Sequence, residues 1–184
     1  MDGNEYKTIK IGSQIWMAEN LRVASFANGS PITLVQNSLQ WQNFHSPSQA
    51  VFENKKENQK YGRIYNWFAV NASENICPLG WKIPSVEDWK TLAKNFGGLN
   101  SGGRILQDQK GFNAQLFGFR AGNFEDFGKS VFYWTSDTDP NQPELPPPGK
   151  TSKAVQLKIN DPNITISNEY QIEGFYIRCL KIID

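Results

Sequence analysis

The side chains best suited to covalent or metal chemistry in this chain are those of two cysteines and one histidine: Cys77, Cys179 and His45. A structural zinc site takes four such ligands, so these three residues cannot complete one. A Ser-His-Asp triad would depend on His45 alone, which stands in a polar, aperiodic stretch. No base, orienting group and nucleophile can be assembled around it. We therefore expect no catalytic residues and no enzymatic activity.

The two cysteines leave two interpretations open. A disulfide that closes a loop of about one hundred residues stabilises a fold by about 4–5 kcal/mol in the chain-entropy model. The alternative is a pair of buried free thiols, because unpaired cysteine is among the most buried residue types. The spacing alone does not decide between them.

The glycines do not indicate nucleotide binding. Residues 149–151 end like a phosphate-binding loop, but Glu144 stands where the first glycine of that loop belongs, and prolines fill the gap. The glycine pairs at 97–98 and 102–103 follow a predicted helix instead of preceding one, so the helix dipole has the wrong direction for a phosphate. We interpret these glycines as turn residues.

Composition and charge exclude several classes of protein. A chain of 184 residues is long enough for one domain over residues 1–184 with a substantial core. Lys and Arg number 19 against 18 Asp and Glu, a formal net charge of +1, so we expect no nucleic-acid partner. No apolar run approaches the roughly 20 residues that a membrane helix needs, so we expect no transmembrane segment. The 13% of aromatic residues, with 15 Gly and 10 Pro, indicates large core anchors joined by many turns.

The clearest local signal predicts a helix over residues 85–98. Ser85 can cap its first turn, and Asp88, three residues later, faces the positive end of the helix dipole. Apolar residues then recur on one face, and Gly97-Gly98 permits a left-handed end. Residues 61–70 are densely apolar and fit either a helix or a buried strand, of which we expect the helix.

Alternating apolar residues predict strands in three places. These are a hairpin over residues 5–17 with a turn at 12–13, a hairpin over 155–166 with a turn at 160–163, and a last strand over 175–183. In the last strand, Phe175, Ile177 and Cys179 share one face, and Tyr176, Arg178 and Leu180 share the other. Residues 24–60 show little periodicity and are expected to be mostly loop, and residues 119–127 and 137–151 are expected to be long surface loops.

Several motifs in a fixed order carry a resemblance to a known family. They are the opening Ile11-Gly12-Ser13-Gln14-Ile15-Trp16, then Tyr61-Gly62-Arg63-Ile64-Tyr65-Asn66-Trp67, Cys77-Pro78-Leu79-Gly80-Trp81, Tyr133-Trp134-Thr135-Ser136 and the closing Gly174-Phe175-Tyr176-Ile177-Arg178-Cys179. Together they resemble the Fibrobacter succinogenes major paralogous domain over essentially the whole chain. That family is similar to the formylglycine-generating (sulfatase-modifying factor) group and, more distantly, to C-type lectin-like folds. The resemblance implies an α+β fold of the C-type lectin-like kind, with two helices, small twisted antiparallel sheets, and paired N- and C-terminal strands.

The same resemblance implies a location outside the cytoplasm. The family occurs mainly in exported bacterial proteins, often behind a lipoprotein signal. We therefore expect a secreted or cell-surface protein, and the resemblance leaves open whether a lipid anchor stands upstream of this chain. A Cys77–Cys179 disulfide would persist in that compartment, which favours the bridge over two free thiols. A formylglycine-generating oxidase would need a reactive, copper-binding cysteine pair. Neither cysteine here stands in the electropositive, exposed setting of a reactive thiolate.

The resemblance to C-type lectins raises calcium-dependent sugar binding as an alternative. Such lectins bind sugar through a Glu-Pro-Asn or Gln-Pro-Asp triplet and a later Asn-Asp pair. Here Gln142-Pro143-Glu144 and Asn160-Asp161 stand at similar places, which makes Glu144, Asn160 and Asp161 the candidate calcium ligands. The Asn160-Asp161 pair is also typical of an ordinary turn, and we expect no required cofactor.

The leading expectation is a binding or adhesion module that recognises a glycan or a surface protein through long loops. Loops tolerate variation on a rigid scaffold, so the ligand contacts are expected there. The candidates are Trp41, taken as an exposed aromatic platform, with Arg120, Asn123 and Glu125 of the 119–127 loop and Gln142 and Glu144 of the 137–151 loop. A structural module of a larger surface or fimbrial assembly is a further alternative.

Overall fold

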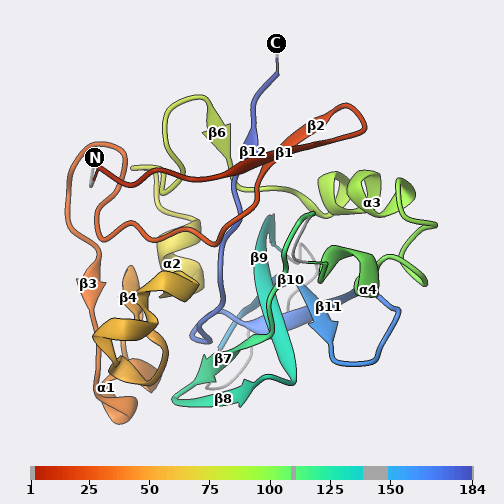
Figure 1. The fold of residues 1–184 in the computed structure, drawn as a ribbon. Helices are drawn as coiled ribbons and strands as arrows, with labels where there is room; N and C mark the ends of the chain where they lie inside the picture. The colour runs from red at the N-terminus through yellow and green to blue at the C-terminus, as the bar shows by residue number, and fades with distance from the viewer. Residues whose placement is uncertain (1–2, 109–110, 139–148, 184) are drawn as a thin grey trace.

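A computed structural model describes residues 3–108, 111–138 and 149–183 of the chain. It is an α+β structure with three small sheets and few, short helices. In the view of Figure 1 the N-terminal hairpin crosses one end of the molecule, and the longest strands run through its middle. None of the helices in the described residues is long and apolar enough to cross a membrane.

The first sheet joins the two ends of the chain. Its order is β1-β2-β12-β6, and all of its pairings are antiparallel; the strands are β1 (Thr8–Ile11), β2 (Gln14–Met17), β12 (Leu180–Lys181) and β6 (Trp81–Lys82). The β1–β2 hairpin confirms the predicted one, and its turn contains Gly12 with a φ of +58°. The C-terminal strand pairs with the N-terminal hairpin through Leu180 and Trp16, so the expected pairing of the chain ends is confirmed.

The second sheet has five strands in the order β11-β10-β9-β7-β8. They are β7 (Phe117–Ala121), β8 (Asn123–Phe127), β9 (Ser130–Thr138), β10 (Thr151–Lys158) and β11 (Thr165–Tyr170). Only β7 and β9 pair in parallel. The β10–β11 hairpin confirms the one predicted over 155–166. The predicted loop over 119–127 is wrong, because most of it forms the β7–β8 hairpin.

The third sheet and the short helices lie mostly in the segments that lacked periodicity. The sheet consists of β3 (Thr33–Leu34), β4 (Ser48–Ala50) and β5 (Ile64–Tyr65). The helices before and after β5 are α1 (Ser38–Gln42), the 3-10 turns η1 (Phe52–Asn54) and η2 (Lys56–Tyr61), and α2 (Trp67–Val70). Residues 24–60 are therefore more ordered than expected. Residues 61–70 are not one helix, because β5 pairs with β4 between η2 and α2.

The helix predicted over 85–98 is confirmed as α3 (Val86–Lys94), shorter at its C-terminal end. Ser85 and Asp88 form a reciprocal capping box, and Lys82 Nζ lies 2.8 Å from Asp88 Oδ2. Trp89 and Leu92 are buried against the five-stranded sheet. With α1, α2 and α4 (Gly103–Leu106), the described residues hold four α-helices, not two, but only α3 exceeds five residues.

The last segment of the chain separates two hydrophobic clusters. Phe175, Ile177 and Cys179 belong to one cluster, whereas Tyr176 and Leu180 belong to the other. This alternation confirms the predicted two faces. The predicted strand over 175–183 is wrong in its extent, because only β12 is a strand there and residues 174–176 form isolated bridges with other segments. Both faces are buried, because each of these five side chains is at most 3% exposed.

The two cysteines form a disulfide, so the bridge is confirmed and the interpretation as free thiols is wrong. Cys77 and Cys179 have Cα atoms 6.0 Å apart and close a sequence separation of 102 residues. Both are buried. The bridge ties the segment before β6 to the C-terminal segment.

Arg178, the neighbour of Cys179, is buried, and no carboxylate of the described residues lies within ion-pair distance of it. Its Nε donates to Asn20 Oδ1 at 2.9 Å, and its two terminal nitrogens donate to the carbonyl oxygens of Phe112 and Asn113. The guanidinium also lies 4.5 Å from the centre of the Phe112 ring. Burial lowers the pKa of Arg178, and a guanidinium remains charged under such conditions. The arginine is thus a structural anchor of the closing motif.

Candidate functional site

Trp41 and Arg120 are buried, so the prediction of Trp41 as an exposed aromatic platform is wrong, and Arg120 does not lie on the surface. Trp41 is 1% exposed and donates from Nε1 to the carbonyl of Ile172 at 2.8 Å. The Arg120 guanidinium lies 4.3 Å from the Trp41 ring centre, and its Nη1 and Nη2 donate to the carbonyls of Val35 and Gln36 at 2.5 and 2.9 Å. Arg120 therefore ties β7 to the segment before α1, and Trp41 ties α1 to the segment after β11. Both side chains have a structural role, because their N–H donors are already hydrogen-bonded to backbone carbonyl oxygens and are not free for a ligand.

Asn123 and Glu125 are exposed on the edge strand β8. Asn123 Oδ1 accepts a hydrogen bond from Ser38 Oγ at 2.9 Å, which fixes the hairpin to α1. Glu125 is electrostatically coupled to Glu173. The four described candidates therefore gather at one corner of the molecule, but only Asn123 and Glu125 present side chains to solvent there.

The calcium candidates form no assembled site in the part of the chain that the structure describes. Gln142 and Glu144 lie outside the described residues. Asn160 and Asp161 occupy the turn between β10 and β11, as predicted for an ordinary turn, and Asp161 Oδ1 accepts from Asn163 N and Nδ2 at 2.9 and 2.6 Å. Within the described ranges, no group of three His, Cys, Asp or Glu side chains could hold a metal ion.

A cleft of about 660 Å³ opens between α2 and the adjacent ends of β9 and β10. Ligand-binding clefts in proteins measure about 300–1,000 Å³. Trp67 and Phe68 of α2 form the aromatic part of its wall. Trp67 is buried against Trp134, with ring centroids 5.3 Å apart, whereas half-buried Phe68 is the ring that a ligand can reach.

The polar wall of this cleft combines amides, hydroxyls and one charge of each sign. Its members are Asn71, Gln171, Ser73, Thr138, Glu74 and Lys150. Glu74 and Lys150 are exposed, and the Glu74 carboxylate accepts from Ser73 Oγ at 3.1 Å. Such a wall can both donate and accept hydrogen bonds.

Hydrogen bonds between the elements hold the cleft in shape. The Asn66 side chain accepts from Ala69 N at 3.2 Å and so starts α2. Trp67 N then donates to Gln171 O at 3.0 Å, and Gln171 N donates to Lys150 O at 2.9 Å. Gln171 Nε2 donates to Ser152 Oγ at 3.0 Å. The helix, the end of β11 and the start of β10 are therefore linked beneath the polar wall.

Sequence reasoning located only part of this cleft. Thr138 and Lys150 belong to the predicted 137–151 binding segment, most of which lies outside the described residues. The segment after α2, which contributes Asn71 to Glu74, carries no motif. Its place in the cleft depends on packing between segments that are distant in the sequence.

A second, smaller cavity contains a carboxyl group that sequence reasoning missed. Glu173, with Trp41 and Tyr170, lines a space of about 170 Å³. Burial, reinforced by the negative charge of Glu169, raises the pKa of Glu173 to about 7. Its Oε2 atom is buried without a hydrogen-bond partner. No local pattern around Glu173 signals this, because the burial comes from α1 and β7.

Comparison with known proteins identifies the family. A search of curated proteins finds no significant match, and a search of solved structures finds none either. The family model described as the Fibrobacter succinogenes major domain matches residues 9–181, which include both disulfide cysteines, the capped helix α3 and the closing Arg178-Cys179 pair. The chain therefore belongs to the Fibrobacter succinogenes major domain family.

Proposed function

We propose that this chain is a non-enzymatic binding module that recognises a glycan in the 660 Å³ cleft beside α2. The observation that carries the proposal is the wall of that cleft, where a reachable aromatic ring stands opposite amides, hydroxyls and a carboxylate. A sugar presents hydroxyl groups that donate and accept hydrogen bonds, together with apolar faces of C–H groups. Amide side chains match the hydroxyls because they also donate and accept, and Phe68 matches the apolar face.

A location outside the cytoplasm is part of this proposal. The support is the Cys77–Cys179 bridge, because disulfides persist in oxidising compartments and are rare in reducing ones. We also propose, on the family resemblance alone, that the fold is related to C-type lectins and that a lipid anchor can stand upstream of the chain.

The bridge also bears on the alternative of a formylglycine-generating oxidase. That chemistry begins from reactive thiols, and both cysteines of this chain are buried in the disulfide. Oxygen consumption with copper and a cysteine-containing peptide tests this alternative. We expect no consumption above a protein-free control.

A glycan array, read with and without EDTA, tests the proposal. We expect binding of at least one glycan class that EDTA leaves intact. Loss of binding in EDTA would instead support the calcium-dependent lectin, and Asp161→Asn should then abolish binding as well. Capture of a protein by pull-down, with no glycan bound, would support a structural module of a larger surface assembly.

Substitutions locate the ligand in the cleft. Asn71→Ala removes an exposed amide from its wall, and Glu74→Gln removes an exposed negative charge. Both variants should fold normally and weaken glycan binding about fivefold or more. Glu57→Gln is the matched control for the charge, because Glu57 is exposed on η2 and lines no part of this cleft. Binding that both cleft variants leave unchanged would contradict the proposed site.

A further inference from the structure

A second cleft, of about 480 Å³, has a strongly basic wall. It lies where the N-terminal segment meets η2 and β5, and its lining consists of Asn4, Arg22, Ala24, Gln59, Lys60 and Arg63. Three of these six residues are cationic and none is acidic. It shares no lining residue with the cleft beside α2, so an inference drawn from it stands apart from the proposed function.

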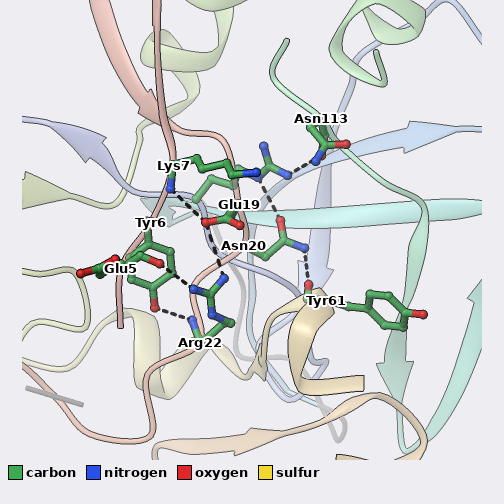
Figure 2. A network of polar contacts seen from close by, with 9 residues as sticks. Glu5, Tyr6, Lys7, Glu19, Asn20, Arg22, Tyr61 and Asn113 are labelled. Carbon is green, nitrogen blue, oxygen red and sulfur yellow. Dashed lines mark hydrogen bonds and ion pairs between the residues drawn. The ribbon is translucent and has the colours of Figure 1, made fainter. Parts of the chain in front are cut away.

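Arg22 is fixed in place by its neighbours, as Figure 2 shows. Its Nη2 donates to the carbonyl of Glu5 at 2.6 Å, and its backbone N–H donates to Tyr6 Oη at 2.8 Å. The guanidinium lies 4.7 Å from the centre of the Tyr6 ring and 3.6 Å from the Glu19 carboxylate. Glu19 also accepts from Lys7 N at 2.9 Å. The charge of Arg22 is therefore largely balanced, and its role is to shape the wall.

The Arg63 guanidinium is hydrogen-bonded through Nε and Nη1, and its Nη2 donors make no hydrogen bond within the described residues. Its Nε donates to the carbonyl of Arg22 at 3.0 Å, and its Nη1 donates to Gln49 Oε1 at 2.6 Å. Both of these acceptors are uncharged. Within the described residues, Arg63 Nη2 has no hydrogen-bond partner and the guanidinium has no carboxylate within ion-pair distance.

Lys60 adds a second unbalanced charge. Its ammonium group lies 5.0 Å from the centre of the Tyr61 ring, and no carboxylate of the described residues pairs with it. Lys60 is exposed at the end of η2, next to the turn that leads into Arg63. The chain as a whole carries a net charge of only +1, so two cations in one cleft that have no carboxylate partner in the described ranges mark a local concentration of positive charge.

We propose that this cleft binds the oxyanion group of an acidic saccharide, either a carboxylate or a sulfate. The free edge of the Arg63 guanidinium and the Lys60 ammonium supply charged donors for the anion. Asn4 and Gln59 supply side-chain amides that can donate to and accept from the hydroxyls of the same sugar. A nucleic acid is disfavoured, because its affinity depends on many phosphate contacts along an extended basic surface.

Binding of the full chain to immobilised polysaccharides tests the proposal. The probes are polygalacturonate for the carboxylate, dextran sulfate for the sulfate, and neutral dextran as the uncharged control. We expect binding to one or both acidic polymers, none to dextran, and competition by the corresponding free sugar acid or by inorganic sulfate. A DNA duplex that competes as well as the acidic polymers would overturn the assignment to a saccharide.

Two variants and a matched control assign the binding to this cleft. Lys60→Gln removes a charge that makes no hydrogen bond to the rest of the described chain, so it should fold normally and weaken binding about tenfold. Arg63→Gln should weaken it at least as much, with thermal unfolding measured in parallel because Arg63 also makes two structural hydrogen bonds. Lys56→Gln makes the same change of charge on the same 3-10 turn outside the cleft and should leave binding within about twofold.

Two results would contradict the proposal. The first is a wild-type chain that binds neither acidic polymer. The second is equal weakening by Lys60→Gln and Lys56→Gln, which would show general charge attraction instead of a site. The two proposals can fail separately. If the chain binds acidic polymers at this cleft but binds no glycan at the cleft beside α2, this inference is upheld and the proposed function is contradicted.

Discussion

Removal of the Cys77–Cys179 bridge should destabilise the chain by about 4–5 kcal/mol. The bridge closes a separation of 102 residues, and the chain-entropy model gives about 4.7 kcal/mol for a loop of about that length. The whole stability of a domain of this size is about 5–15 kcal/mol, so the loss is a large part of it. The perturbation is the double variant Cys77→Ala, Cys179→Ala, compared with reduced wild-type protein.

Guanidinium unfolding, followed by tryptophan fluorescence, measures this loss. The chain has six tryptophans, and Trp16, Trp67, Trp89 and Trp134 are all buried, so unfolding changes their surroundings strongly. Coincidence with far-ultraviolet circular dichroism checks two-state behaviour. Since the entropic effect acts on the unfolded chain, the double variant and the reduced wild type should agree within about 1 kcal/mol.

The result that would refute this reasoning is a loss below about 1 kcal/mol in both forms. It would mean that the bridge does not constrain the unfolded chain, or that it does not form in solution. Alkylation of the unreduced, denatured protein separates the two cases, because a formed bridge leaves no thiol to react. A large loss in the double variant alone would indicate lost packing at the buried sulfurs, not lost chain entropy.

Three further changes have definite expected results. Ser85→Ala removes the side-chain cap of α3 and should cost about 1 kcal/mol in thermal unfolding, whereas Ser85→Thr should cost less. Arg178→Met leaves two buried oxygen acceptors and one half-buried acceptor without a donor and should cost at least about 3 kcal/mol in denaturant unfolding; an unchanged midpoint would contradict the structural role of this arginine. Because burial, with help from Glu169, raises the pKa of Glu173 from 4.5 to about 7, the folded chain keeps a proton there that the unfolded chain releases. Stability should therefore fall as the pH rises from about 4.5 to 7, and Glu173→Gln should remove that part of the fall, as unfolding at a series of pH values measures.

The parts of the fold that sequence reasoning predicted depend on local patterns. The helix α3 combines a capping residue, an apolar stripe and a glycine stop within one short segment. Both predicted hairpins have alternating strands on either side of a turn. In each case, the residues that decide the structure are neighbours in the sequence, so their pattern is visible before folding.

The parts that were wrong depend on distant partners. Arginine is usually a surface residue, so the sequence places Arg120 at the surface. The carbonyl groups that accept its hydrogen bonds in the interior belong to Val35 and Gln36, about eighty residues earlier in the chain. Trp41 stands in a polar stretch, but Ile172 accepts its indole N–H from a separation of 131 residues. The sequence shows the polarity of a segment, but it does not show which hydrogen-bond acceptor a distant segment will place beside it.

The closing motif explains how short, irregular elements can present two separate clefts. Phe175, Ile177 and Cys179 pack into one cluster, and alternate residues of the same extended segment pack into the other, so this single segment is the common wall of both cores. The disulfide fixes that wall to Cys77, and the carbonyl groups bound by Arg178 fix it to the segment before β7. Since these anchors lie at the centre, residues 71–74 and the turn at Lys60 can change in sequence without loss of the core. If the two clefts bind ligands as proposed, exchanging residues 71–74 between two members of the family should transfer ligand preference without a change in fold.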